Sequence, residues 1–307
     1  MPLWGFLLSF LAAAMWAASP IMVSRGLARA GCSIHEVNPF RAVSFLIASV
    51  IAALISSGGN IPIVTSPLAW ACFFFSVITS YTLGDLFFFL AIREMGVSLA
   101  IPVANSYPIL VIFTSWLMLG EAVTPKLIWG VALVVAGLIL LRFGGEKAEP
   151  GEKVRHSAAQ LMRGFSLAIG GGLCWAVSSP VTKIAMNISQ LGAAEITLYR
   201  AFVFMIVTIA VRILTVKFRP SATIPLLSVP RTAAAYFLSA AVIGLCLGSV
   251  IYAKCISVMP VAVVTAITAT SPFMAALYGR FVLKESLTAP QWCGITMIIA
   301  GSVIVGL

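Results

Sequence analysis

A duplicated stretch constrains this chain more than any other feature. The segment NSYPILVIFTSWLMLGEAVTPKLIWGVALVVAGLILL, residues 105–141, resembles the closing segment that starts at Ala269. A constant shift of 164 positions aligns Pro108 with Pro272, Glu121 with Glu285, Thr124 with Thr288, Gly130 with Gly294 and Gly137 with Gly301. Similarity at a fixed shift marks a duplicated unit. Each copy holds an apolar run, a short polar break and a second apolar run, so we predict a helix pair.

Composition places these apolar runs in a lipid bilayer. The 307 residues are 61% hydrophobic and only 9% charged, with a mean hydropathy of +1.09. A soluble domain is about one quarter charged, so this chain cannot cover a water-facing surface. Apolar runs of roughly 17–25 residues, the length that spans a bilayer as helix, recur throughout. We therefore predict an all-α integral membrane protein, with the lipid bilayer as a partner of its helices.

The apolar runs predict ten transmembrane helices, with approximate bounds 3–24, 37–56, 67–92, 97–119, 125–142, 163–183, 195–214, 231–256, 261–282 and 289–306. A polar linker at 143–162 divides the chain into a repeat at 1–142 and a repeat at 163–307. In the early part of each repeat the shift is 159, which pairs Trp16 with Trp175, Glu36 with Glu195 and Arg41 with Arg200. Because five spans are an odd number, the second repeat enters the membrane from the opposite face. Two inverted five-helix repeats are typical of secondary transporters, whose site lies near the midplane.

Several other classes of function lack support in the sequence. The net charge of +10 could indicate nucleic acid, but almost all of the basic residues lie in short connections, where they set membrane orientation. The six cysteines are scattered without the spacing of a disulfide framework or metal site. The two histidines, His35 and His156, both lie in connecting segments. We expect no enzyme, no cofactor, no metal and no nucleic-acid partner.

Matched prolines suggest where helices break. Pro20 and Pro180 lie inside the first and sixth spans, and Pro108 and Pro272 inside the fourth and ninth. Proline removes a backbone donor and frees a carbonyl about four residues earlier. Such groups are tolerated in lipid where protein or a water-filled cavity supplies partners. A packing kink is the alternative at each position, and the symmetry of the pairs favours breaks beside a cavity.

The closing helix of each repeat carries two glycines seven residues apart. They share one helix face, and small residues allow membrane helices to approach closely, so we predict tight packing there. Glu121 and Glu285 precede these helices, in the connecting loops. We interpret both glutamates as solvated residues at the membrane surface.

Charged residues inside spans need a partner or a function, because each costs at least ~2.5–3.5 kcal/mol on insertion. Arg41 and Arg200 follow their glutamates by five residues, which places the two side chains about 140° apart on a helix. Either the arginines extend to the interface, or they line a transport pathway. Asp85 has an uncharged counterpart, Ser249. It could couple transport to a proton, contact substrate, or pair with an arginine of the second span.

Five more side chains complete the predicted substrate pathway. Trp16 and Trp175 lie well inside their spans, where they could pack in the core or stack on a substrate. Asn105 and Tyr107 flank the Pro108 break and offer hydrogen bonds. Lys183 ends the sixth span, as an interfacial anchor or a pathway residue. The arginines and Lys183 outnumber Asp85, which favours a substrate with a carboxylate or phosphate.

These motifs together resemble the EamA-type carriers of the drug/metabolite transporter superfamily. The resemblance rests on Trp-Ala near the start of each repeat, Glu-x4-Arg opening the second span, and Pro-x12-Glu followed by Gly-x6-Gly. Trp175 with Lys183 looks like the family's Trp-x7-Lys pattern, whereas position 24 of the first repeat is serine. The resemblance implies a ten-helix carrier of small metabolites, often amino acids or related amphipathic compounds, working by alternating access.

Charge predicts an orientation that departs from this family's habit of cytoplasmic termini. Fourteen basic residues would lie on the side opposite the termini, namely Arg25, Arg29, Arg93, Arg142, Lys147, Lys153, Arg155, Arg163, Arg212, Lys217, Arg219, Arg231, Arg280 and Lys284. Only Lys126, Lys183 and Lys254 would share the side of the termini. Since basic loops stay inside, we predict both termini outside a cell (inner or plasma) membrane.

The sequence therefore favours a secondary active transporter that moves a small polar or amphipathic metabolite, such as an amino acid, across the membrane. A channel or a non-transporting membrane sensor is the main alternative, followed by a lipid-modifying membrane enzyme. A proton is the candidate coupling ion.

Overall fold

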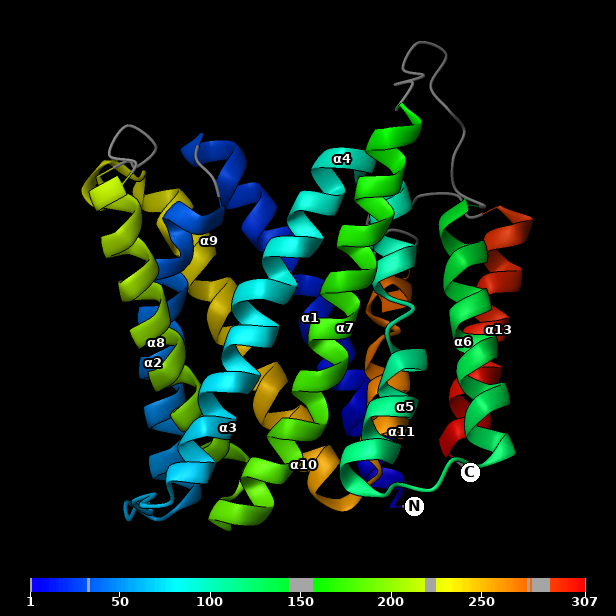
Figure 1. Cartoon of the computed structure of the whole chain (residues 1–307), viewed down its shortest axis with the longest axis horizontal. Helices are drawn as coiled ribbons and strands as arrows, with labels where there is room; N and C mark the ends of the chain where they lie inside the picture. The colour runs from blue at the N-terminus through cyan, green and yellow to red at the C-terminus, as the bar shows by residue number, and fades with distance from the viewer. Residues whose placement is uncertain are drawn as a thin grey trace.

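The computed structural model describes residues 2–31, 34–143, 157–218, 225–274, 277 and 288–306. Within these residues the backbone is helical, with no strand. The helices form a bundle in which α1 begins and α13 ends at the same end (Figure 1). We call that end the terminal face and the other end the opposite face.

The first half of the chain contributes α1 (Leu3–Ala30), α2 (Ile34–Ser56), α3 (Pro67–Val77), the π-helix η1 (Ile78–Gly84), α4 (Asp85–Ala104), α5 (Pro108–Leu119) and α6 (Pro125–Phe143). The second half contributes α7 (Ala158–Ser189), α8 (Ala193–Phe218), the short 3-10 helix η3 (Leu226–Ser228), α9 (Arg231–Ala240), the π-helix η4 (Ala241–Gly248), α10 (Ser249–Val258), α11 (Val261–Thr268) and α13 (Ala289–Gly306). In the described part of the chain, seven helical segments are long and apolar enough to cross a membrane. Three shorter apolar helices accompany them, at Pro108–Leu119, Pro125–Leu141 and Val261–Met274.

Local sequence explains where several helices begin and end. Ser66 caps α3 by accepting a hydrogen bond from the backbone N–H of Ala69 at 3.3 Å. Ser157 and Gln160 form a capping box at the start of α7. Gly120 ends α5 with φ at 67°, a left-handed conformation that glycine adopts without a steric penalty.

The two π-helices lie at equivalent places in the two halves, since η1 and η4 end at Gly84 and Gly248. Each of these glycines faces a tryptophan of the other half. A Cβ added to Gly84 would lie 2.5 Å from Nε1 of Trp175, and one added to Gly248 would lie 2.8 Å from Nε1 of Trp16. Any larger residue at either position would therefore displace the indole ring.

Helices α6 and α13 pack closely through the glycines of their repeated Gly-x6-Gly motif. A Cβ on Gly137 would lie 2.6 Å from the carbonyl oxygen of Gly294, and a Cβ on Gly301 would lie 2.6 Å from that of Gly130. The two backbones are thus in direct contact, with no side chain between them. The predicted close packing of these helices is confirmed.

The matched prolines differ in what they do to the backbone. Helix α5 starts at Pro108, after a turn at residues 105–107, and Pro272 follows a turn at residues 269–270. At Pro20 and Pro180 the helix is not broken, contrary to expectation: α1 and α7 run through both positions. For α7 the reason is visible, because the Thr114 hydroxyl donates to the carbonyl of Ala176 at 2.8 Å, the group that Pro180 leaves without its helical donor.

Candidate functional site

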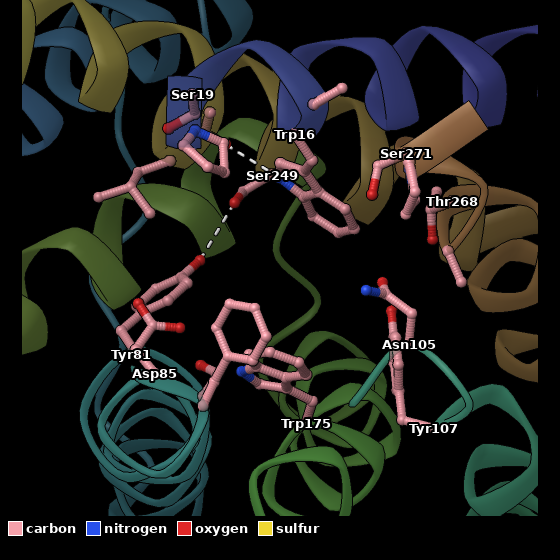
Figure 2. Close-up of a pocket in the computed structure, with 18 of the residues that line it drawn as sticks. Trp16, Ser19, Tyr81, Asp85, Asn105, Tyr107, Trp175, Ser249, Thr268 and Ser271 are labelled. Carbon is pink, nitrogen blue, oxygen red and sulfur yellow. Dashed lines mark hydrogen bonds between the residues drawn. The ribbon is translucent and has the colours of Figure 1, made fainter. Parts of the chain in front are cut away.

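A cavity of about 730 Å³ lies in the middle of the helix bundle. Its walls come from helices α1, α2, α4, α6, α7, α8, α10, α11 and α13, from the two π-helices, and from the turns before α5 and after α11. Figure 2 shows part of this lining. Seven of the eight predicted pathway residues line it: Trp16, Arg41, Asp85, Asn105, Tyr107, Trp175 and Arg200. Pro20 and Pro272 line it as well, whereas Pro108, Pro180 and Lys183 do not.

The two tryptophans form aromatic walls on either side of the cavity (Figure 2). Trp16 donates from Nε1 to the carbonyl of Gly244 at 3.0 Å, and its ring centroid lies 5.2 Å from that of Tyr252. Trp175 lies 5.5 Å from Phe88 and 5.8 Å from Tyr107, measured between ring centroids. The carbonyl of Gly244 belongs to a π-helix, so the widened turn supplies the acceptor for the indole. Each tryptophan thus lines the cavity while its position is fixed by neighbours.

Arg41 and Asp85 form an ion pair in the cavity wall. Nη2 of Arg41 lies 4.0 Å from Oδ2 of Asp85, and Nη1 donates to Oδ1 of Asn38 at 2.9 Å. Arg41 is only 7% exposed, so it does not extend to the membrane interface. Of the three alternatives for Asp85, the structure shows the pairing with an arginine of the second span.

Arg200 is equally buried, at 6% exposure, and it too faces the cavity. Its Nη2 donates to the Ser80 hydroxyl at 3.2 Å, and its guanidinium carbon lies 4.8 Å from the centre of the Tyr81 ring. Tyr81 in turn shares a hydrogen bond of 3.1 Å with Ser249 (Figure 2). A cation on an aromatic face is stabilised by about 2 kcal/mol or more when desolvated.

Lys183 lies outside the cavity, in a cluster that also corrects the interpretation of Glu121. The Glu121 side chain is only 11% exposed, so it is not solvated. It accepts hydrogen bonds from Lys183 Nζ at 3.1 Å and from the backbone N–H groups of Val261 at 2.8 Å and Ala262 at 3.3 Å. Lys183 also donates to the carbonyl of Met259 at 3.2 Å.

This Glu121–Lys183 cluster joins the loop after α5, the end of α7 and the start of α11, all at the terminal face (Figure 1). The carboxylate takes up the first free N–H groups of α11, where it also meets the positive end of the helix dipole. Sequence reasoning could not place a loop glutamate against a helix 140 positions later. Glu285, its counterpart, and the linker residues 144–156 lie outside the described residues, and of the Glu36 side chain nothing is described.

The cavity extends from the middle of the bundle toward the opposite face. Its lining includes Leu27 near the end of α1, Ile92 of α4, Leu141 of α6 and Gln291 at the start of α13. Toward the terminal face it reaches Thr182, one residue short of Lys183. Among the described residues, the Glu121–Lys183 cluster therefore lies beyond the closed end of the cavity.

Several lining residues escaped sequence reasoning, among them Ser80, Tyr81 and Tyr252. The π-helix η1, which positions Ser80 and Tyr81, has no local signature in the sequence. For Tyr252 the repeat itself offered a signal, because this residue occupies the position equivalent to Phe88, so both halves carry an aromatic residue there. Within the described residues, no group of three or more His, Cys, Asp or Glu gathers as metal ligands would.

A bundle of apolar helices around a central cavity with polar and aromatic walls defines a multi-pass membrane protein with room for a small solute. The chain belongs to the EamA-like transporter family, whose profile matches residues 3–143 and again residues 162–307. It is a transmembrane transporter of that family.

Similar proteins carry the same general description. An uncharacterized transporter of Archaeoglobus fulgidus is 25% identical over 224 residues, which cover 73% of this chain and 71% of that protein. The uncharacterized transporter YwfM of Bacillus subtilis is 25% identical over 248 residues, 77% of this chain and 73% of that protein. A solved crystal structure shares the fold with a TM-score of 0.70 at 17% identity, covering 99% of this chain and 96% of its own.

Proposed function

We propose that this protein is a secondary active transporter that moves a small polar or amphipathic metabolite, such as an amino acid, by alternating access. In this proposal ten helices cross the membrane as two inverted five-helix repeats, 1–142 and 163–307, joined by the linker 143–162. The shared cavity between the repeats holds the solute. The observation that carries the proposal is that this cavity has walls from both halves and ends at the Glu121–Lys183 cluster.

Contacts between equivalent positions support the inverted repeat. Trp175 packs on Gly84 and Trp16 on Gly248, so each half supplies the tryptophan that the other half's π-helix receives. The glycine contacts between α6 and α13 are related in the same way. A pseudo-two-fold axis in the membrane plane would generate both sets of contacts.

The cavity has the dimensions and chemistry of a small-molecule site. Its volume of about 730 Å³ falls within the roughly 300–1,000 Å³ of known ligand pockets, which combine apolar walls with a few placed polar groups. Here the walls are aromatic and the polar groups include one ion pair and a second buried arginine.

A channel is the main rival. A pore requires a continuous path, whereas the Glu121–Lys183 cluster and the 2.9 Å hydrogen bond between Tyr252 and Thr265 lie on the terminal side of this cavity. A lipid-modifying enzyme would require clustered catalytic side chains, whereas the two buried arginines here are held by Asp85 and Asn38 on one side and by Ser80 and Tyr81 on the other.

Counterflow in proteoliposomes tests the carrier proposal. Vesicles loaded with a saturating unlabelled metabolite should accumulate the labelled compound transiently above equilibrium, and the initial rate should saturate with concentration. Unsaturable flux without counterflow would indicate a pore. A panel of labelled amino acids and organic acids, assayed at two pH values, also tests whether Asp85 couples transport to protons.

A further inference from the structure

The two equivalent arginines of the cavity have different partners. Arg41 is the eighth residue of α2 and Arg200 the eighth residue of α8. Asp85 and Ser249 are likewise equivalent, since each is the first residue after a π-helix. The first half therefore supplies its arginine with a carboxylate, and the second half supplies a hydroxyl at the same place.

The second acceptor of Arg41 is also replaced around Arg200. Asn38, which accepts from Arg41, corresponds to Thr197, whose hydroxyl donates instead to the carbonyl of Ala193 at 2.8 Å. Both acceptors in the Arg41 environment thus have hydroxyl residues as counterparts in the Arg200 environment.

Arg200 is consequently a buried cation without a counter-charge among the described residues. Its Nη2 donates to the Ser80 hydroxyl, its Nε has no hydrogen-bond partner, and no ion pair of the described residues includes it. Glu195 is buried on the same helix, but five residues earlier, so it projects about 140° away. An uncompensated buried charge costs several kcal/mol, and an anion bound from the cavity would remove that cost.

We propose that Arg200, with Ser80 and Tyr81 beside it and Ser249 hydrogen-bonded to Tyr81, binds the carboxylate of an amphipathic monocarboxylate. The substrate carboxylate occupies the place that Asp85 occupies beside Arg41. Guanidinium groups bind carboxylates through strong, charge-assisted hydrogen bonds. This inference rests on the proposed carrier function and narrows its substrate class.

The charges of the cavity distinguish among anions. Among the described residues, the charged side chains that line the cavity are Arg41, Arg200 and Asp85, which leaves one positive charge. A monocarboxylate neutralises that charge, a phosphate monoester overcompensates it, and a zwitterion brings a second cation whose best acceptor, Asp85, is already paired with Arg41. The aromatic walls at Trp16 and Trp175 fit an apolar remainder of the molecule.

Binding to the purified wild-type protein in detergent tests the proposal, read from quenching of tryptophan fluorescence and from calorimetry. The probes are 3-phenylpropionate and octanoate, with 3-phenylpropionamide, phenylalanine and phenyl phosphate as comparisons. We expect both monocarboxylates to bind at least about tenfold more tightly than the amide, the zwitterion and the phosphate. Equal or tighter binding of any comparison compound would overturn the assignment, as would failure of both carboxylates to bind.

Two substitutions at Ser249 locate the site. Ser249→Asp places a carboxylate beside Arg200 in the manner of Asp85, so it should weaken carboxylate binding at least about tenfold. Ser249→Asn adds similar bulk without charge and should weaken carboxylate binding less than Ser249→Asp does. Arg200→Gln should remove the preference for carboxylate over amide. A thermal melt establishes that each variant is folded. If Ser249→Asp and Ser249→Asn weakened carboxylate binding equally, the charge argument would be contradicted.

The counterflow and binding experiments together separate failure of the monocarboxylate site from failure of the carrier proposal. Amino acid counterflow without selective carboxylate binding would leave the carrier intact and remove the monocarboxylate site. Selective carboxylate binding that depends on Arg200, without counterflow of any compound, would leave the site intact and remove the carrier.

Discussion

Removing the charge of Glu121 should open the terminal face. Glu121→Gln keeps the size of the side chain but loses the ion pair with Lys183, whose Nζ lies 3.1 Å away. The amide can still accept one hydrogen bond from the start of α11, yet it cannot replace a carboxylate that accepts from Lys183, Val261 and Ala262 together. The segments that this cluster joins should then separate more often.

The structure sets the size of the effect. Breaking a fully buried ion pair costs about 3–5 kcal/mol, and the 11% and 21% exposure of the two side chains reduces this to about 3 kcal/mol. Since 1.4 kcal/mol corresponds to a factor of ten, the opening equilibrium at the terminal face should rise about 100-fold.

Hydrogen exchange measures this opening directly. Val261 and Ala262 follow Pro260, so they carry the first backbone N–H groups of α11, and both donate to Glu121. Exchange at these amides through local opening should accelerate about 100-fold in Glu121→Gln. Glu94→Gln is the matched control, because it removes an exposed ion pair with Arg163 at 4.0 Å that is worth at most about 1 kcal/mol. Unchanged exchange at the start of α11 would refute the reasoning.

Three further predictions concern coupling, packing and orientation. Asp85→Asn leaves Arg41 buried without its carboxylate, so transport and its pH dependence should both fall; unchanged rates at every pH would remove the coupling role. Gly137→Val places a side chain against the Gly294 carbonyl and should destabilise the protein by about 1–3 kcal/mol in a detergent melt, whereas Ile139→Val on the exposed face should not. A C-terminal reporter that is active only in the cytoplasm should stay silent, because the end of α1, the start of α7, the end of α8 and the start of α9 lie at the face opposite the termini and carry Arg25, Arg29, Arg163, Arg212, Lys217 and Arg231; a signal would reverse the orientation.

The sequence predicted those features of the fold that depend on composition and repetition. Apolar run length gave helices close to their observed bounds, and the Gly-x6-Gly motif predicted the contact between α6 and α13. The outcome at Pro20 and Pro180 was not predictable in this way. Whether a freed carbonyl breaks a helix depends on donors such as Thr114, which lies on another helix.

In the candidate site, too, the residues that recur in both repeats were predictable, whereas those that depend on contacts between distant segments were not. Trp16, Trp175 and the two arginines were found because they recur at a fixed shift. Tyr81 lacks an equivalent aromatic residue, since its counterpart is Leu245, so the repeat could not point to it. The role of Glu121 depends on a contact between distant segments, which local propensity does not encode.

The accessibility of one cavity position from both sides of the membrane tests the central claim most directly. Ser179 lines the cavity, and a Ser179→Cys variant without native cysteines can be labelled in vesicles by an impermeant thiol reagent added to either face. The account predicts labelling from both faces, with the share from the terminal face raised by Glu121→Gln and the total lowered by transported substrate. Labelling from one face alone, in every variant and with substrate present, would contradict alternating access.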